Sequence, residues 1–279
     1  MCNNLYTLIT GASEGFGKAL AIECASRKMN LILVALPKSK LNSFAESLKQ
    51  KYEIEVLAIE KDLSIEENCF LVFKEVHELQ LSVNMLINNV GISSTMFFSE
   101  GNVDFYQKQV KLNVIVTTLL TSLFLDMLKT NKPSHILNVG SLSSFFYLAK
   151  KQVYGATKSY IYSFSKSLRG ELSSDGINVT VICPGGMNTN ATIIMTNKSN
   201  NWLARQSIMN PEEVAPIAIK GLLNRKEIII PGRMNKLFLI IDKLLPSFII
   251  KMIANNHINK FKSYSIGNQN NVPFIGRAY

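Results

Sequence analysis

Cysteine and histidine are scarce in this 279-residue chain, and neither occurs in a spacing that binds a metal. The four cysteines are widely separated and form no CxxC pair, which argues against a disulfide framework or a zinc site and favours buried thiols in a reducing compartment. The three histidines are isolated from one another, so a metal site is not expected. The residues concerned are Cys2, Cys24, Cys69, Cys183, His77, His135 and His257.

The chain also lacks a Pro/Gly/Ser-rich linker, an internal repeat and a low-complexity tract. We therefore expect one large domain for most of its length, with enough apolar residues to bury a substantial core. The first residues lead directly into a strand pattern, without the charged lead and apolar core of a secretory signal. A cytoplasmic protein is expected.

Acidic residues are few near the end of the chain. From Lys220 to Tyr279, ten Lys or Arg residues stand against two acids, while the whole chain has a net charge of +10. Apolar residues recur at helical spacing between Leu237 and Ile253. Charged residues and Pro246 interrupt them, so a membrane span is not expected.

This basic, apolar extension, residues 234–279, has more than one possible role. It can pack on its own domain or on a sister subunit, or lie on an anionic membrane surface as a peripheral contact. Nucleic acid is not an expected partner, because the basic residues lie in no recognisable binding motif.

The rest of the chain alternates short β-branched or aliphatic runs with longer helical patterns. Strands are predicted at Leu5–Thr10, Leu31–Ala35, Glu55–Ile59, Met85–Asn88, His135–Gly140, Asn178–Cys183 and Ile228–Pro231. Helices are predicted at Gly15–Arg27, Lys38–Lys51, Ile65–Leu79, Asp104–Lys129, Gln152–Ser174 and Pro211–Asn224. This order predicts an α/β protein with a doubly wound parallel sheet, whose ligand site lies outside the carboxyl ends of the strands.

Tyr154 and Lys158 stand four residues apart in a predicted helix, so their side chains share one face. A lysine cation beside a tyrosine stabilises the phenolate and lowers its pKa, which makes the phenol a usable acid or base. Such a pair alone is more often an ordinary helix surface. Its meaning depends on the residues that accompany it.

A glycine-rich turn, Gly11-Ala12-Ser13-Glu14-Gly15-Phe16-Gly17, joins the first strand to the first helix. Glycines there let the backbone approach a phosphate, and the helix start offers unpaired N–H groups. Asp62-Leu63 follows the third strand, where a carboxylate can accept from an adenine amino group. Asn88-Asn89-Val90-Gly91 ends the fourth strand and can hold its end open to a cofactor.

Polar residues follow the later strands as well. Ser141 comes at the end of the fifth strand, thirteen residues before Tyr154. Asn113 interrupts an apolar helical pattern, where a buried amide needs hydrogen-bond partners; it is either functional or a structural residue at a local distortion. After the sixth strand, the segment from Pro184-Gly185 to Thr189 breaks the pattern at the edge where a ligand would bind.

Taken in order, the motifs TGxxxGxG, NNxG, Asn, Ser, YxxxK and PGxxxT resemble those of the short-chain dehydrogenase/reductase family, from the first strand to about Thr189. The resemblance implies a single Rossmann-type domain with a seven-stranded parallel sheet, here residues 1–233 with a substrate lid at about 190–210, and a homodimer or homotetramer. It implies that Tyr154 is the general acid, that Lys158 lowers its pKa and binds the nicotinamide ribose, and that Ser141 positions the carbonyl. By the same resemblance, Asn113 holds a water that connects Lys158 to solvent, and Thr189 meets the carboxamide.

The same resemblance gives a set of cofactor-binding residues. They are Gly11, Ser13, Glu14, Gly15, Phe16, Gly17, Leu36, Lys38, Asp62, Leu63, Asn89, Gly91, Tyr154, Lys158, Pro184, Gly185 and Thr189. NAD users of the family commonly have an acid near Leu36, and this chain has none. Lys38 and Lys40 can meet a 2′-phosphate, although Glu14 would oppose it, so NADP is preferred over NAD.

The expected activity is hydride transfer between a nicotinamide cofactor and a carbonyl compound or secondary alcohol. Two segments, Ser93–Phe98 and about Asn190–Asn210, are expected to set specificity; with the residues after Ser141 they are rich in apolar side chains. That favours a fairly hydrophobic ketone, such as a 3-oxoacyl, steroid-like or aromatic compound, although the same residues can simply pack the lid. The alternative function is a cofactor-binding sensor or scaffold without turnover.

Overall fold

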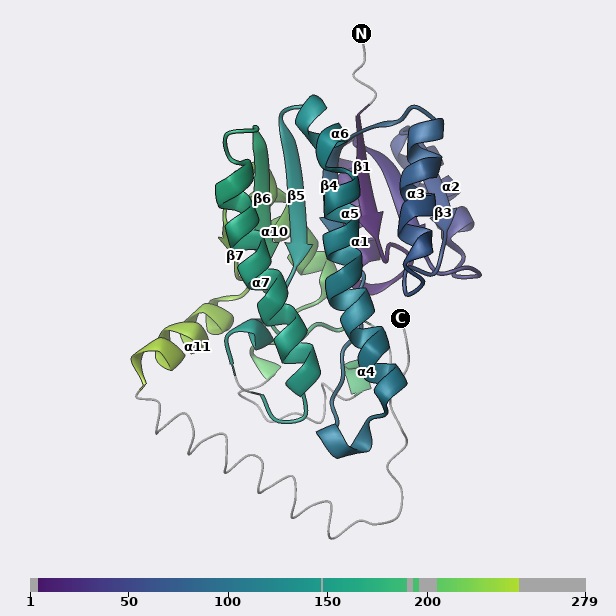
Figure 1. Ribbon diagram of the computed structural model, residues 1–279. Helices are drawn as coiled ribbons and strands as arrows, with labels where there is room; N and C mark the ends of the chain where they lie inside the picture. Colours follow the sequence, from purple (N-terminus) through teal and green to yellow (C-terminus); the bar gives the residue numbers. More distant parts are fainter. Residues whose placement is uncertain (1–4, 147, 190–192, 196–204, 246–279) are drawn as a thin grey trace.

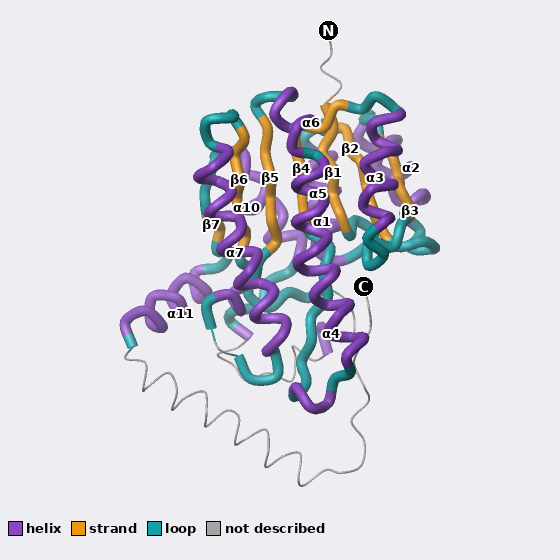
Figure 2. The backbone as a smooth tube through the Cα atoms, in the orientation of Figure 1, coloured by secondary structure: helices purple, strands orange, loops and turns teal. Residues whose placement is uncertain are grey.

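The computed structural model describes residues 5–146, 148–189, 193–195 and 205–245, which form a seven-stranded parallel sheet with helices on both faces (Figures 1 and 2). The strand order is β3-β2-β1-β4-β5-β6-β7, and every neighbouring pair is parallel. The predicted fold class is confirmed. The strands are β1 (Leu5–Thr10), β2 (Asn30–Ala35), β3 (Val56–Glu60), β4 (Ser82–Asn88), β5 (Ser134–Val139), β6 (Ile177–Ile182) and β7 (Ile228–Ile229).

The connections between the strands carry the helices that a parallel sheet requires. The α-helices are α1 (Gly15–Ser26), α2 (Leu41–Tyr52), α3 (Glu67–Glu78), α4 (Val103–Val110), α5 (Val116–Leu123), α6 (Leu125–Thr130), α7 (Gln152–Leu172), α10 (Pro211–Leu223) and α11 (Arg233–Leu244). Short helical turns are η1 (Phe98–Glu100), the π-helical η2 (Lys111–Ile115) and η3 (Leu142–Ser144).

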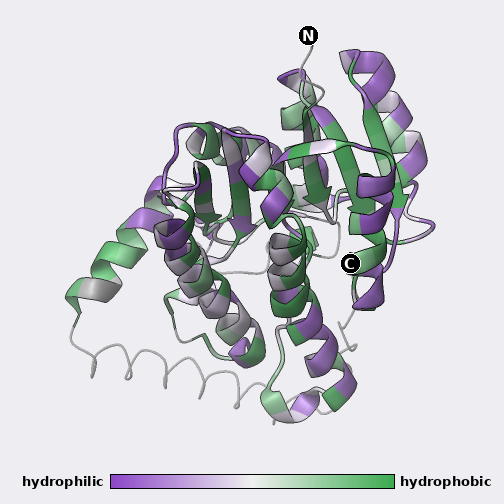
Figure 3. Ribbon diagram, turned by 45° about the horizontal axis from the view of Figure 1, so that its top comes forward, coloured by the Kyte–Doolittle hydropathy of each residue, from purple (hydrophilic) through white to green (hydrophobic). Residues whose placement is uncertain are grey.

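Two apolar layers, one on each face of the sheet, form the core. Leu8 and Ile9 are neighbours on β1 and fully buried, yet they belong to opposite layers because successive strand side chains point to opposite faces. The Ile9 layer contains α1, α2 and α10, and the Leu8 layer contains α3, α5, α6 and the end of α7. Figure 3 shows the corresponding pattern, with hydrophobic strands and helices that are hydrophilic on their outer sides.

The helix predicted over Asp104–Lys129 is broken in the structure. A π-turn at Lys111–Ile115 separates α4 from α5, and a second break at Phe124 separates α5 from α6. Phe124 is fully buried, so the bend follows the packing of its ring in the core rather than solvent exposure. A periodic apolar pattern predicts the helices but not these interruptions.

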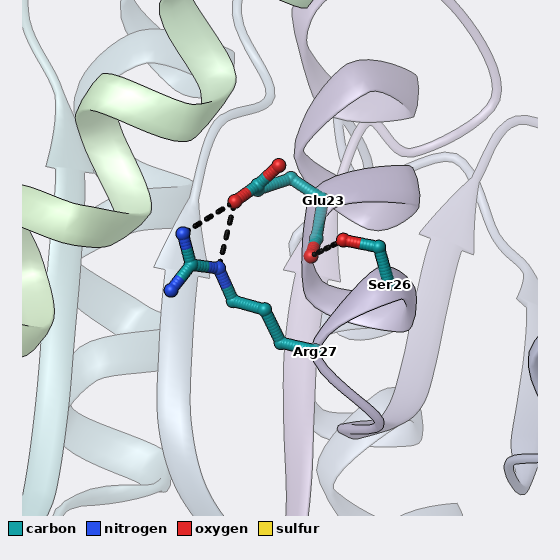
Figure 4. A network of polar contacts seen from close by, with 3 residues as sticks. All are labelled: Glu23, Ser26 and Arg27. Atoms are coloured by element: carbon teal, nitrogen blue, oxygen red, sulfur yellow. Dashed lines mark hydrogen bonds and ion pairs between the residues drawn. The ribbon is translucent and has the colours of Figure 1, made fainter.

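Helix α1 has side-chain contacts in its last turn, but no side chain caps its N-terminus. Arg27 pairs with Glu23 one turn earlier at 2.6 Å, and the Ser26 hydroxyl donates to the Glu23 carbonyl over 2.8 Å (Figure 4). An ion pair this accessible stabilises by only about 0.3–0.5 kcal/mol. At the other end, Glu14 makes no side-chain capping hydrogen bond, so the first N–H groups of α1 are left for another partner.

Helix α11 follows β7 and extends away from the sheet (Figure 1). It is attached through Asn235, whose amide is buried and donates to the Pro231 carbonyl over 2.7 Å. Its other side is apolar and exposed, with Leu237, Ile240, Ile241 and Leu244 between 41% and 78% accessible. Within the described ranges, no helix combines the length and apolar character that crossing a bilayer requires.

The cysteines that the structure describes, Cys24, Cys69 and Cys183, are buried free thiols, as predicted. Burial raises the pKa of Cys24 and Cys183 to about 12, which keeps both thiols protonated at neutral pH. Cys2 lies outside the described residues.

Candidate active site

The carboxyl ends of the strands meet at one edge of the sheet, at the bottom of Figure 1, where α7 and α4 also begin. Tyr154 and Lys158 lie one turn apart near the start of α7, as their spacing predicts. Tyr154 is half-buried and Lys158 is only 6% exposed. The pair is therefore set into the protein and does not belong to an ordinary helix surface.

The Lys158 ammonium is bound to the end of the neighbouring strand. It donates to the backbone carbonyl of Val139, the last residue of β5, over 2.7 Å. Burial lowers the pKa of Lys158 to about 8, because the charged form loses its hydration. The same nitrogen lies 5.9 Å from the centroid of the Tyr154 ring.

The Ser141 side chain lies beside the Tyr154 phenol, close enough to act on its pKa. Burial raises the pKa of Tyr154, the Ser141 side chain lowers it, and nearby Cys183 raises it, so the net shift is upward. Lowering of this pKa by Lys158 stays a prediction. The lysine is directed to the Val139 carbonyl, and burial weakens its own charged form.

Ser141 is placed by the end of β5 and caps the short turn η3. Its backbone is extended, and its hydroxyl oxygen accepts from the Ser143 amide over 3.1 Å. Because η3 packs against α7, the Ser141 hydroxyl is held beside the phenol, as the sequence predicts.

Asn113 sits in the π-turn between α4 and α5 and is 1% exposed. Its amide oxygen accepts from the Ile92 amide over 2.8 Å, and its nitrogen donates to the Ile92 carbonyl and to the Thr157 hydroxyl, both over 3.0 Å. Asn113 therefore joins a helix distortion to the loop after β4, and its functional role stays a prediction. A side chain on Gly91 would come within 2.7 Å of the Asn113 oxygen and 3.6 Å of the Lys158 nitrogen, so Asn113 and Lys158 flank the same backbone position.

The loop between β1 and α1 has glycines where a side chain would not fit, so a ligand can come close to its backbone. Gly11 and Gly15 have φ values of +65° and +53°, in the region that favours glycine. A β-carbon on Gly17 would lie 2.0 Å from the Gly11 carbonyl oxygen, so no side chain fits there. With the uncapped first turn of α1, this cradle suits a negatively charged phosphate.

Several predicted cofactor residues face the protein interior instead. The side chains of Phe16 and Leu63 are buried in the two core layers, so only their backbones can face a cofactor. Asn89 donates to the carbonyls of Thr10 and Gly11 over 2.8 and 3.3 Å, which braces the glycine loop against β4.

Asp62 closes the turn after β3. One of its carboxylate oxygens accepts from the Ser64 amide over 2.9 Å, and its carbonyl accepts from the Asn68 amide nitrogen over 2.8 Å. The carboxylate is half-buried and keeps acceptor capacity for a further donor. Contact of Asp62 with an adenine stays a prediction.

The end of β2 is basic. Leu36 is half-buried, and the exposed Lys38 and Lys40 both have left-handed backbone conformations, with φ of 63° and 59°. Between them, the hydroxyl oxygen of Ser39 is buried and has no hydrogen-bond partner among the described residues. The site therefore offers two cations and one orphaned hydroxyl, and no acid, at the end of this strand.

The segment after β6 reaches back to the glycine loop. The Pro184 carbonyl accepts from the Leu142 amide over 2.9 Å. A side chain on Gly15 would meet Thr189 at 3.1 Å, and one on Gly185 would meet the Ser207 carbonyl at 2.6 Å. Gly15 and Thr189, 174 positions apart in the chain, thus form one rim of the site.

These features fit a nicotinamide dinucleotide. The glycine loop and α1 would hold its phosphates, the end of β2 its adenosine ribose, and Lys158 and Thr189 its nicotinamide half. Contacts of Ser13, Glu14, Leu36, Lys38, Gly91 and Gly185 with a cofactor remain predictions.

Of the apolar residues predicted to bind substrate, some are packed inside the protein and others are exposed. Phe145 packs at 4.7 Å on the Tyr162 ring and Met209 packs on the core, as the lid-packing interpretation expects. Phe98 and Met195 are 61% and 73% exposed. Tyr147 and the lid residues 190–192 and 196–204, which include Trp202 and Leu203, lie outside the described residues.

Sequence reasoning missed a buried polar chain beneath the site. The Asn88 amide donates to Thr121 over 3.1 Å and to Asn138 over 2.9 Å, and Asn138 donates to Ser165 over 2.9 Å. It links β4, α5, β5 and α7; Asn113 comes just before α5, Ser141 just after β5, and Tyr154 lies in α7. The signal was present as two amides inside otherwise apolar strands.

Sequence reasoning also missed Lys151, three residues before Tyr154. Its ammonium donates to the loop after β4 and lies 5.1 Å from the centroid of the Tyr154 ring. Burial lowers the pKa of Lys151 to about 8. No local pattern reveals this contact, because it joins residues 56–58 positions apart.

Comparison with known proteins gives one consistent result. The family model for short chain dehydrogenases matches residues 6–200. The chain is 29% identical over 269 residues to putative steroid dehydrogenase 4 of Caenorhabditis elegans, covering 93% of this chain and 97% of that protein. It is 29% identical over 229 residues to an NADP-dependent 3-hydroxy acid dehydrogenase of Schizosaccharomyces pombe, covering 80% and 88%. Among solved structures, a short-chain dehydrogenase from Sphingobium yanoikuyae in complex with NADPH has a TM-score of 0.73 at 25% identity, covering 96% and 98%.

Proposed function

Since this chain belongs to the short-chain dehydrogenase family, whose members act on CH–OH and C=O groups, we propose that it reduces a fairly hydrophobic ketone with NADP(H), or oxidises the matching alcohol. The observation that carries this proposal is the meeting of Tyr154, Ser141 and Lys158 at the carboxyl edge of the sheet, beside a glycine loop that suits a phosphate.

Each residue has a role that its surroundings support. Tyr154 protonates the carbonyl oxygen during reduction and takes the proton back during oxidation. Ser141, which lies beside the phenol, donates its one O–H to that oxygen and so fixes the carbonyl beside the acid. Lys158 holds the nicotinamide ribose and the positive charge near the phenol, and Asn113 keeps the loop of Gly91 in position and orders a water toward Lys158. The bound nicotinamide supplies or accepts the hydride.

The preference for NADP rests on the end of β2. An acid that would bind ribose hydroxyls is absent there, whereas Lys38, Lys40 and the unpartnered Ser39 hydroxyl suit a 2′-phosphate. The relative and the structural neighbour named with NADP and NADPH support the same choice.

A panel of ketones and alcohols, assayed with both cofactors, tests the proposed function. The panel should contain 3-oxoacyl, steroid and aromatic ketones, and the readout is the nicotinamide absorbance. We expect turnover of at least one class, with a lower KM for NADPH than for NADH. Binding of cofactor without turnover on any class would favour the sensor or scaffold function instead.

We also propose that the protein works as a homodimer or homotetramer and that α11 makes a peripheral membrane contact. The apolar residues on the exposed side of α11 recur at positions 237, 240, 241 and 244, one face of a helix. Exposed Arg233 and Lys236 flank this face, in a stretch with ten basic and two acidic residues. This composition suits an anionic lipid surface better than a second, equally basic copy of the helix.

A further inference from the structure

Lys151 forms a small polar cluster with the loop after β4. It is the last residue before α7, and its ammonium donates to the Ser94 carbonyl and the Thr95 hydroxyl, both over 3.1 Å, and to the Ser93 hydroxyl over 3.2 Å. We call Lys151, Ser93 and Thr95 the lysine cluster. It joins the segment before the catalytic helix to one wall of the predicted substrate site.

The lysine cluster carries a positive charge that no acid neutralises. Among the described residues, Lys151 has no ion pair with an Asp or Glu. Its ammonium lies 5.1 Å from the centroid of the Tyr154 ring, on which the proposed chemistry depends. The three acceptors of this ammonium are all neutral, so its charge is not balanced, and such a group suits an anion that arrives from solution.

The two hydroxyls of the cluster are also ready for a ligand. Ser93 and Thr95 are exposed, and each accepts a hydrogen bond from Lys151. A hydroxyl that accepts in this way still has its own O–H to donate, and neither has another partner among the described residues. The cluster therefore offers two O–H donors backed by one positive charge, an arrangement that matches the two oxygens of a carboxylate.

We propose that the lysine cluster binds the carboxylate of a 3-oxo acid or 3-hydroxy acid, while the oxygen on C3 faces Tyr154. This inference rests on the proposed function and narrows its substrate class. The Lys151 nitrogen lies 5.1 Å from the centroid of the Tyr154 ring, so a carboxylate at the cluster and a carbonyl at the phenol belong to one short molecule, such as an acid whose C3 stands two C–C bonds from the carboxyl carbon. The apolar remainder of the acid extends toward the hydrophobic part of the site, and Lys151 takes no part in the bond changes.

The test compares sodium 3-hydroxyhexanoate with its uncharged methyl ester, using the full-length enzyme and NADP⁺. The wild type should have a KM for the acid at least tenfold below that for the ester. In Lys151→Met the KM for the acid should rise at least tenfold more than the KM for the ester. Lys151→Arg, which keeps the charge, should retain the preference for the acid.

The neighbouring lysine provides a matched control. The Lys150 ammonium lies 4.4 Å from the centroid of the Phe97 ring, and Lys150→Met should leave both KM values unchanged. As a second readout, calorimetric titration of 3-hydroxyhexanoate into the enzyme with bound NADPH should show binding that Lys151→Met loses. NADPH binding and a cooperative thermal transition verify that each variant is folded.

Three results would overturn the inference: equal use of acid and ester by the wild type, equal losses on both in Lys151→Met, or no binding of the acid in calorimetry. Failure of the proposed function is distinguishable from these. In that case the whole ketone and alcohol panel gives no turnover, whereas failure of this inference alone leaves turnover of uncharged ketones intact.

Discussion

At the scale of single residues, burial controls the chemistry of this site. It acts against the charged forms of both proposed catalytic groups, raising the pKa of Tyr154 and lowering that of Lys158 to about 8. The Ser141 side chain is the one group that works in the opposite direction on the phenol. A proton donor at neutral pH is compatible with this arrangement, because the phenol stays protonated until it reacts.

Lys158→Met should therefore abolish turnover while it stabilises the protein. A lysine whose pKa falls from 10.5 in the unfolded chain to about 8 in the fold destabilises the folded state when charged. Its replacement should raise the free energy of unfolding at pH 7 by about 1–3 kcal/mol. Urea denaturation with the wild type alongside measures this difference.

The pH dependence of this stability difference tests whether the lowered pKa of Lys158 causes it. Between pH 8 and pH 10.5 the unfolded wild type binds the proton that the fold has released, so wild-type stability from this group rises with pH in that window. The advantage of Lys158→Met should shrink through this window and disappear only above about pH 10.5. A variant that is less stable at pH 7 would mean that the hydrogen bond to Val139 outweighs the cost of burial.

At the scale of elements, the site is held by irregularities between regular strands and helices. The glycine loop before α1, the π-turn around Asn113 and the turn η3 after β5 each position one functional group. The glycine loop is the tightest of them, since a β-carbon on Gly17 would overlap the Gly11 carbonyl.

Gly17→Ala should abolish NADPH binding and destabilise the fold, because the loop must open to admit the methyl group. Gly170→Ala is its matched control, in the interior of α7, where an added β-carbon meets nothing within 4 Å. That control should bind NADPH normally and gain about 0.5–1 kcal/mol from its lower backbone entropy when unfolded. Fluorescence titration with NADPH and thermal unfolding distinguish the two, and normal NADPH binding by Gly17→Ala would contradict the role of the loop.

The sequence predicted these elements well where local patterns decide them. β1 has the predicted bounds, and the other six strands differ from their predicted bounds by no more than three residues at either end. What the sequence could not supply depends on distant contacts. The break at Asn113 follows from its bonds to Ile92 and Thr157, and the turn of Lys158 toward Val139 follows from the packing of α7 on β5. Lys151 was missed for the same reason.

At the scale of the whole molecule, the candidate site and the start of α11 both lie at the edge of the sheet where the strands end. The two apolar layers leave this edge free for function, and α11 extends away from the sheet after β7 (Figure 1). Asn235 of this helix is buried, whereas its apolar residues at 237, 240, 241 and 244 are exposed. A protein that presents such a face and a net charge of +10 is suited to collect a hydrophobic substrate at an anionic surface.

The double variant Ile240→Glu/Leu244→Glu tests that contact. Wild-type protein should co-sediment with phosphatidylglycerol vesicles at low salt, less so at high salt, and the double variant should remain in the supernatant. Phe70→Glu, an exposed apolar residue on α3, should sediment like the wild type. Loss of the native oligomer in the double variant, with no vesicle binding by the wild type, would instead identify this face as a subunit interface.

The most direct test of the proposed chemistry is hydride transfer by Tyr154→Phe on any ketone that the wild type reduces. The substitution removes one hydroxyl, keeps the ring in place and leaves the glycine loop untouched, so NADPH affinity measured by fluorescence should be unchanged. Turnover should fall by about 10²–10⁴-fold, the usual contribution of a general acid. Turnover equal to that of the wild type would contradict Tyr154 as the proton donor.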